Sequence, residues 1–316
     1  MKGKIYLLFL GALIVNGLQV VSVDFGLGFT PQNLSSPFEV GKEISDFNIA
    51  VVGDMGCSSV VKQTIGEIKL KNPELILALG DLSYQKSSAN CWFNIVSPVY
   101  SKMKIVLGDH DYRSSSILKQ YRNHFNLSKD YYSFNYHNVH FIALATEIPF
   151  DRNSTQYSFV RTDLEKASKD PDIRWIIVFC YRPQYSSPSV HPGNGDLRDV
   201  FHPLFQKYKV DLILQGHNHN YQRSYPINYN EATPSDPMIV DHNLRSYQDT
   251  EGQIYLEVGT GGAQPHRLGG KAPFIAFQQE GYGFLDLSFT NNGENLTGIF
   301  YSSNDNAIQD SFTVIK

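Results

Sequence analysis

The chain has 316 residues, with 27 lysines and arginines against 31 aspartates and glutamates, which gives a formal net charge of −4. This charge argues against binding nucleic acid through bulk electrostatics, because such affinity depends on neutralising phosphates with lysine and arginine. Hydrophobic residues make up 41% of the chain and charged residues 18%, which excludes a largely disordered protein.

The first residues have the pattern of a targeting sequence. Lys2 and Lys4 precede an apolar run over residues 5–15 and a weaker one over residues 18–23. A positive start followed by an apolar stretch predicts a secretory signal peptide over residues 1–23, or an N-terminal anchor if the segment is not cleaved. We expect an N-terminal extension over residues 24–46 and one domain over residues 47–316.

Four sites for N-glycosylation agree with export, although such tripeptides also arise by chance. They lie at Asn33, Asn126, Asn153 and Asn295. The sequence therefore predicts a secreted or cell-surface glycoprotein that touches the membrane only through its N-terminal segment, if that segment is retained. It leaves the oligomeric state open.

The chain has three cysteines, Cys57, Cys91 and Cys180. Because the number is odd, at least one is unpaired or pairs between chains. Cys57 and Cys180 each lie close to a candidate site residue, and we expect both to be buried as small hydrophobic side chains.

Apolar runs that end abruptly at a polar residue recur along the chain. Runs that are apolar on both faces predict buried strands, and they lie at residues 48–53, 74–80, 104–108, 174–180 and 210–216. Helical patterns fall between them, at residues 60–70, 117–125, 162–169 and 197–208. Strands that alternate with helices predict a mostly parallel sheet.

Other segments predict antiparallel strands. Residues 131–136 and 139–146 flank a turn at His137 and Asn138, and residues 281–290 and 295–302 flank another turn. Residues 253–258 form a further strand with a glycine-rich exit. We therefore expect an α/β domain of two packed mixed sheets with helices outside, and long surface loops at residues 186–196 and 226–250.

The polar residues that follow the five buried strands are the candidates for chemistry. In parallel sheets the carboxyl ends of the strands meet at one edge, which gathers Asp54, Asp81, Asp109, Tyr181 and His217, with His219 close by. Carboxylate and imidazole together suit Zn, Fe or Mn, and two such ions can clamp a phosphoryl group. Ordinary strand-end turns are the alternative, but five in sequence are hard to explain in that way.

At this point the chain resembles the purple acid phosphatases, a branch of the calcineurin-like metallophosphoesterases. The resemblance runs over residues 47–289 and rests on five ordered blocks: Gly53-Asp54-Met55-Gly56, Gly80-Asp81-Leu82-Ser83-Tyr84, Gly108-Asp109-His110-Asp111, Val178-Phe179-Cys180-Tyr181 and Gly216-His217-Asn218-His219. The length suggests the small, mammalian-type branch. The resemblance implies a four-layer α/β/β/α sandwich.

The resemblance also implies a role for each matching residue. The first metal, Fe(III) in that family, takes Asp54, Asp81, Tyr84 and His219, with Asp81 bridging to a second ion. His217 matches a ligand of the second ion, which is Fe, Zn or Mn. His110 and Asp81 are the expected catalytic residues, and His110 also steers the phosphate. Tyr185 and Tyr221 follow two of the motifs and are expected to line the substrate pocket, unless they pack in the core.

Two positions depart from the family pattern, and both belong to the second metal. The family has asparagine where this chain has Asp109, and histidine where it has Tyr181. Each replacement adds an anionic oxygen donor in place of a neutral one, and the phenol must first lose its proton, whose pKa is normally about 10. The second site is therefore retuned, weakened, or adapted to a second trivalent ion.

The resemblance predicts an exported acid phosphatase that hydrolyses small phosphomonoesters with a dinuclear centre of Fe(III) and a divalent metal. The alternative is a pseudophosphatase, a surface or secreted binding protein with a weakened second metal site. A nucleotide-cleaving enzyme on the same fold ranks last, because no basic stripe is present for a polynucleotide. Three further histidines carry weaker expectations: His191 and His202 as loop or helix residues rather than ligands, and His266 as one that could reach the site.

Overall fold

The computed structural model describes residues 44–316. The predicted signal peptide, the first of the four glycosylation sites and almost all of the predicted extension lie outside the described residues. Among residues 44–316, none of the helices combines the length and the apolar character that crossing a bilayer requires.

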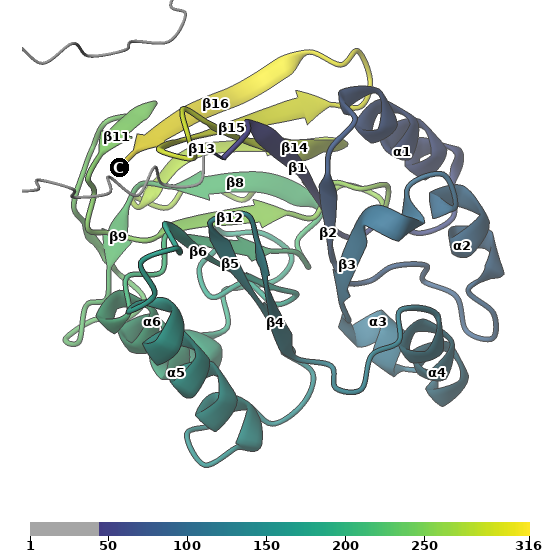
Figure 1. Cartoon of the computed structure of the whole chain (residues 1–316). Coiled ribbons are helices and arrows are strands. Elements are labelled where there is room, and N and C mark those ends of the chain that lie inside the picture. The colour runs from purple at the N-terminus through teal and green to yellow at the C-terminus, as the bar shows by residue number, and fades with distance from the viewer. Residues whose placement is uncertain (1–43) are drawn as a thin grey trace, which may run out of the picture. The chain divides into compact units, whose positions relative to one another are not determined.

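Two sheets of seven strands each make up the centre of the described part (Figure 1). The first has the order β11 (Ser246–Gln248), β16 (Ile308–Ile315), β15 (Asn295–Ser302), β14 (Gly283–Thr290), β1 (Phe47–Val52), β2 (Leu75–Leu79), β3 (Met103–Val106). The second has the order β13 (Ile275–Glu280), β8 (Asn220–Ser224), β12 (Ile254–Val258), β7 (Leu212–Gln215), β6 (Trp175–Cys180), β5 (Val139–Leu144), β4 (Tyr132–Tyr136). A short ribbon of β9 (Ile227–Asn228) and β10 (Met238–Ile239) stands apart.

Helices lie on the outer faces of the two sheets (Figure 1). They are α1 (Ser59–Lys71), α2 (Asn90–Val96), α3 (Asp109–Tyr112), α4 (Ser115–His124), α5 (Thr155–Ala167) and α6 (Gly195–Lys207), with a 3₁₀ turn at Tyr100–Lys102. α1, α2 and α4 pack on the first sheet in one hydrophobic cluster, and α5 and α6 pack on the second in another.

A third hydrophobic cluster fills the space between the sheets. Ile49 and Leu77 from the first sheet and Phe141, Ile177 and Leu214 from the second are fully buried there. Buried apolar area on this scale is the main stabilising contribution to a fold. The expected four-layer α/β/β/α sandwich of two mixed sheets is thereby confirmed.

Strand direction decides where the polar residues go. β1, β2 and β3 run parallel in the first sheet, and β5, β6, β7 and β12 run parallel in the second. The residues that follow β1, β2 and β3 therefore leave at one edge of the first sheet, and those that follow β6 and β7 leave at one edge of the second.

Several details differ from the sequence-based expectation. α5 begins at Thr155 rather than at residue 162, because the side chain of Ser154 accepts a hydrogen bond from Tyr157 N and caps the helix there. Residues 226–250, expected as a loop, contain β9, β10 and β11. Cys57 is not a free buried thiol but forms a disulfide with Cys91, whereas Cys180 is free and buried as expected.

Candidate metal centre

Four of the predicted site residues adopt left-handed backbone conformations. The φ angles are 55° at Asp54, 48° at Asp81, 56° at Tyr84 and 77° at His217. Non-glycine residues rarely occupy this region, and such strain persists only where the surrounding structure enforces it. Backbone hydrogen bonds do so here: Asp54 N donates to Gly80 O and Met55 N to Asp81 O, which ties the turns after β1 and β2 together.

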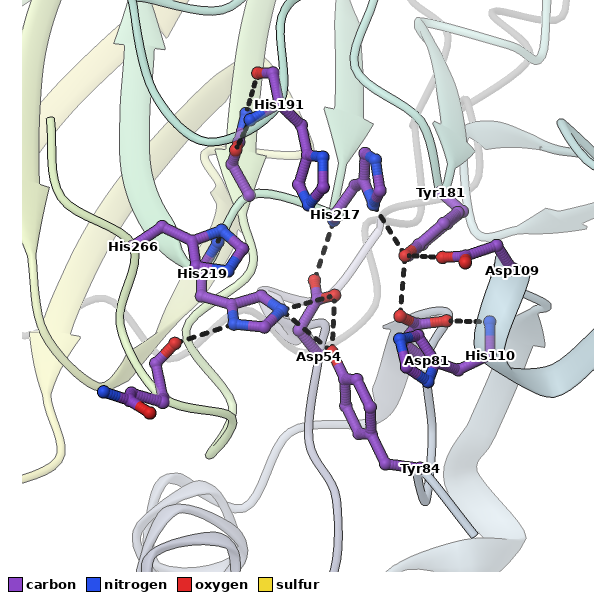
Figure 2. A network of polar contacts seen from close by, with 12 residues as sticks. Asp54, Asp81, Tyr84, Asp109, His110, Tyr181, His191, His217, His219 and His266 are labelled. Carbon is purple, nitrogen blue, oxygen red and sulfur yellow. Dashed lines mark hydrogen bonds and ion pairs between the residues drawn. The ribbon is translucent and has the colours of Figure 1, made fainter. Parts of the chain in front are cut away.

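The first donor group consists of Asp54, Asp81, Tyr84 and His219 (Figure 2). Tyr84 Oη lies 3.1 Å from Asp54 Oδ1 and 2.9 Å from His219 Nε2, and the latter two atoms are 3.5 Å apart. His219 Nδ1 lies 2.7 Å from the carbonyl oxygen of Gln264, which only accepts, so Nδ1 carries a proton. Nε2 is left facing the oxygen donors, as in metal-binding histidines.

This group fits a metal ion. Ligand atoms held about 2.1 Å from one ion lie about 3 Å apart, close to the separations among Asp54, Tyr84 and His219. Burial and the carboxylates of Asp54 and Asp111 raise the pKa of Asp81 to about 9, so the protein itself supplies little positive charge at this point. Hard oxygen donors with one imidazole suit Fe, Zn or Mn.

The second donor group consists of Asp81, Asp109, Tyr181 and His217, and its geometry is different (Figure 2). The Tyr181 hydroxyl oxygen lies 2.6 Å from Asp81 Oδ2, 2.7 Å from Asp109 Oδ1 and 2.7 Å from His217 Nδ1. These are hydrogen-bond lengths. In this arrangement Asp81, Asp109 and His217 surround a phenol oxygen, so a cation between these three residues would have to displace it. Asp81, Asp109 and His110 also offer ligand atoms within 4.8 Å of one another.

His110 and Arg113 lie at the open side of the centre. The His110 backbone N–H donates to Asp81 Oδ1 at 2.9 Å, and its ring packs 4.5 Å from that of Tyr84, centroid to centroid. Arg113 contacts both His110 Nδ1, at 3.1 Å, and the Asp109 carboxylate. Tyr84, Lys86, His110 and Arg113 line a cavity of about 580 Å³, enough for a small phosphate ester.

Tyr185 and Tyr221 are not brought to the centre, so the prediction that they line the pocket is wrong. The Tyr185 hydroxyl bonds His202 Nδ1 at 2.8 Å beneath α6, and the Tyr221 hydroxyl donates to Asp310 at 2.9 Å between the sheets. Both side chains are buried in hydrophobic clusters. The alternative of core packing, which the sequence left open, is the correct one.

Other residues at the centre received little or no weight from the sequence. The ring of His191 stacks on His217 at 3.9 Å, and the ring of His266 stacks on His219 at 3.8 Å. Asp111 is fully buried and accepts hydrogen bonds from Gly108 N and Leu82 N. The motif around Asp109 was a usable signal for Asp111, whereas only the three-dimensional fold brings His191 and His266 close.

Comparison with known protein families agrees with this geometry. The sequence profile of the calcineurin-like phosphoesterases matches residues 47–221. Purple acid phosphatase 22 of Arabidopsis thaliana is 28% identical over 210 residues, which cover 60% of this chain and 48% of the plant protein. Phosphoenolpyruvate phosphatase of Allium cepa is 27% identical over 293 residues, covering 83% of this chain and 58% of that protein. The chain thus spans about half the length of the plant relatives it matches.

Two solved structures share the fold. Purple acid phosphatase from yellow lupin seeds matches with a TM-score of 0.71 and 23% identity, over 86% of this chain and 54% of the lupin chain. A Plasmodium protein described as the anchor in the inner membrane complex matches with a TM-score of 0.68 and 19% identity, over 86% of this chain and 90% of that one. At these identities the likeness concerns the fold alone.

Proposed function

Because the chain belongs to the calcineurin-like phosphoesterases, we propose that it is a metal-dependent phosphatase that hydrolyses small phosphomonoesters. The observation that carries the proposal is the convergence of Asp54, Tyr84 and His219 donor atoms within 3.5 Å of one another. A metal ion held there would polarise a phosphoryl oxygen and lower the pKa of a water molecule.

The side chains around the centre support binding of a phosphate monoester. Lys86 and Arg113 bring positive charge to the cavity and attract the anionic substrate. The guanidinium of Arg113 only donates, so the neutral His110 ring accepts at Nδ1 and carries its proton on Nε2. His110 can therefore donate a hydrogen bond from Nε2 to the oxygen of the leaving alcohol and stabilise the negative charge that develops there.

The finer assignments come from the sequence resemblance to the purple acid phosphatases and are proposals for this chain. They are Fe(III) in the first donor group and an acidic optimum. The second ion of Fe, Zn or Mn that the resemblance implies would have to displace the Tyr181 hydroxyl from the second donor group. The branch of the family and the domain limits also stay predictions.

We further propose that the chain is exported and glycosylated. The Cys57–Cys91 disulfide supports this, because disulfides persist mainly in oxidising compartments. Asn126 and Asn153 are exposed, as acceptors for glycans must be. Mass spectrometry of the native protein, together with cell fractionation, tests both points. A cytosolic protein that keeps residues 1–23 and carries no glycans would contradict them.

A binding protein on the phosphatase fold is the second candidate. It is favoured by one observation, the hydrogen bonding of the Tyr181 hydroxyl to three residues of the second donor group. On this alternative the centre holds a phosphorylated ligand without turning it over.

Hydrolysis of an aryl phosphate by the purified, iron-loaded full chain tests the proposed function. We expect turnover that a chelator abolishes and that falls at least about 10²-fold in the variant Asp54→Asn. The variant Asp163→Asn, on α5 away from the centre, is the matched control and should keep full activity. A folded, metal-loaded protein without turnover would reject the enzyme and favour the binding protein.

A further inference from the structure

We propose that the hydroxyl of Tyr181 takes the place of the second metal ion, so that each chain binds a single ion, in the first donor group. The inference rests on the proposed function only in assuming that the first donor group holds a metal. It concerns the two positions that depart from the family pattern, Asp109 and Tyr181.

The convergence of three side chains on the Tyr181 oxygen carries the argument. In the first group the Tyr84 oxygen lies 2.9 and 3.1 Å from two neighbours, which are themselves 3.5 Å apart, and separations of about 3 Å suit ligands of a common ion. In the second group the Tyr181 oxygen is 2.6–2.7 Å from each of three neighbours, which come from three different strand ends. The Tyr181 oxygen therefore occupies the point toward which the other three donors converge.

The ring of Tyr181 is held at this point by two glycines. A Cβ atom on Gly80 would lie 2.7 Å from Tyr181 Cδ2, and a Cβ atom on Gly108 would lie 2.7 Å from Tyr181 Cε2. The ring thus packs directly on the backbone that follows β2 and β3, and the side chain is only 1% exposed. A ring packed in this way has little freedom to swing aside for a cation.

The side chains around Tyr181 each have a close polar partner within the protein. Asp109 Oδ1 contacts the Tyr181 hydroxyl, while Asp109 Oδ2 contacts the guanidinium of Arg113. The positive charge of Arg113 offsets the negative charge that Asp109 has and an asparagine does not. His217 Nδ1 contacts Tyr181, and its backbone N–H donates to Asp54 Oδ2 at 2.8 Å. A second ion would have to displace these contacts before it could bind.

Metal counting tests the inference. The purified full chain is loaded with excess iron and zinc, freed of unbound metal, and analysed for metal per chain. We expect one ion per chain in the native protein and in Tyr181→Phe, which keeps the ring in place. We expect two ions in the double variant Asp109→Asn/Tyr181→His, which restores the family's neutral donors. Tyr185→Phe, a buried tyrosine away from the centre, is the matched control and should bind one ion.

Two results would overturn the inference. Two ions in the native chain, with one lost in Tyr181→Phe, would mean that Tyr181 is a phenolate ligand of a second ion. One ion in the double variant as well as in the native chain would mean that Tyr181 is not what excludes the second ion. If the double variant does not fold, anomalous diffraction from native crystals loaded with zinc decides, since a peak beside Asp109 contradicts the inference.

The outcome is distinguishable from that of the proposed function. One ion with turnover supports both statements, and one ion without turnover supports the inference while rejecting the enzyme. Two ions with turnover reject the inference alone. A native chain that binds no metal rejects both.

Discussion

The proton on His110 is fixed by a single neighbour. Arg113 Nη1 lies 3.1 Å from His110 Nδ1, and because a guanidinium has no acceptor, the neutral imidazole must carry its proton on Nε2. Asp109 holds Arg113 one helical turn away, so the carboxylate at that position orients the histidine indirectly. Asp109, which stands where the family has asparagine, thus holds Arg113 in place through an ion pair that a neutral asparagine could not form.

Replacing His110 tests its role as a hydrogen-bond donor to the leaving group. We expect His110→Asn to lower kcat about 10²-fold for an alkyl phosphate, whose leaving oxygen develops a localised negative charge, and much less for an aryl phosphate. Steady-state kinetics with the two substrates measures the difference, and His124→Asn, an exposed histidine on α4, is the control. Equal losses for both substrates would contradict the role and indicate only a positioning effect.

At the scale of elements, the tight turns after the strands position the ligands. Gly80, directly before Asp81, has a φ of 91°, and Gly56, two residues after Asp54, has a φ of 86°. Residues with a Cβ atom disfavour both conformations. The two positions differ in their surroundings, because a Cβ atom at Gly80 would meet Tyr181 and Gly108 within 2.8 Å, whereas one at Gly56 meets only Tyr84 Cδ2, at 3.6 Å.

A series of alanine variants separates strain from packing. We expect Gly56→Ala to lower the free energy of unfolding by about 1 kcal/mol through strain alone. Gly80→Ala should cost at least about 3 kcal/mol, because strain and overpacking add. Gly66→Ala, in the middle of α1 with nothing within 4 Å, should instead stabilise by about 0.5–1 kcal/mol. Urea unfolding measures all three, and equal effects at Gly56 and Gly80 would contradict the packing of Tyr181.

Helix α6 carries a buried histidine that makes the fold sensitive to acid. Burial lowers the pKa of His202 to about 4, whereas in an unfolded chain it is about 6.5. At pH values between these two the unfolded state binds the extra proton, so stability is full above pH 6.5 and falls as the pH decreases toward 4. The loss from this residue should reach about 2 kcal/mol at pH 5.

The pH dependence of thermal unfolding tests this residue. The slope of Tm between pH 7 and pH 5 should be smaller in His202→Gln than in the native protein, while His124→Gln should leave the slope unchanged. Parallel curves for the native protein and His202→Gln would contradict the assignment. The result also sets the acid limit within which a phosphatase assay reports on a folded chain.

At the scale of the whole molecule, the Cys57–Cys91 disulfide links the turn after β1 to the start of α2 and encloses Asp81 and Tyr84. The bridge spans 34 residues, and closing such a loop should stabilise the fold by about 3–4 kcal/mol. Urea unfolding of the oxidised protein against Cys57→Ser/Cys91→Ser should show this difference, and a reducing agent should have no effect on the double variant. Equal stabilities would mean that the bridge contributes nothing to the fold.

The layered fold and most of the centre could be predicted from sequence because they follow from strand direction. Asp54, Asp81 and His217 each come directly after a buried apolar run, and parallel strands deliver such residues to one edge. Tyr185 and Tyr221 follow site motifs along the chain, which predicts a place for both at the pocket. Tyr221 lies on β8 and its ring packs into the core between the sheets, whereas Tyr185 packs beneath α6. The place of the Tyr181 hydroxyl depends on Gly80 and Gly108, and no local pattern encodes that contact.

Anomalous diffraction at the iron edge from crystals of the iron-loaded full chain tests the central claim most directly. The account predicts one strong peak enclosed by Asp54 Oδ1, Tyr84 Oη and His219 Nε2, at coordination distance from each. The absence of a peak at that point, or iron bound at another place in the described domain, would contradict it.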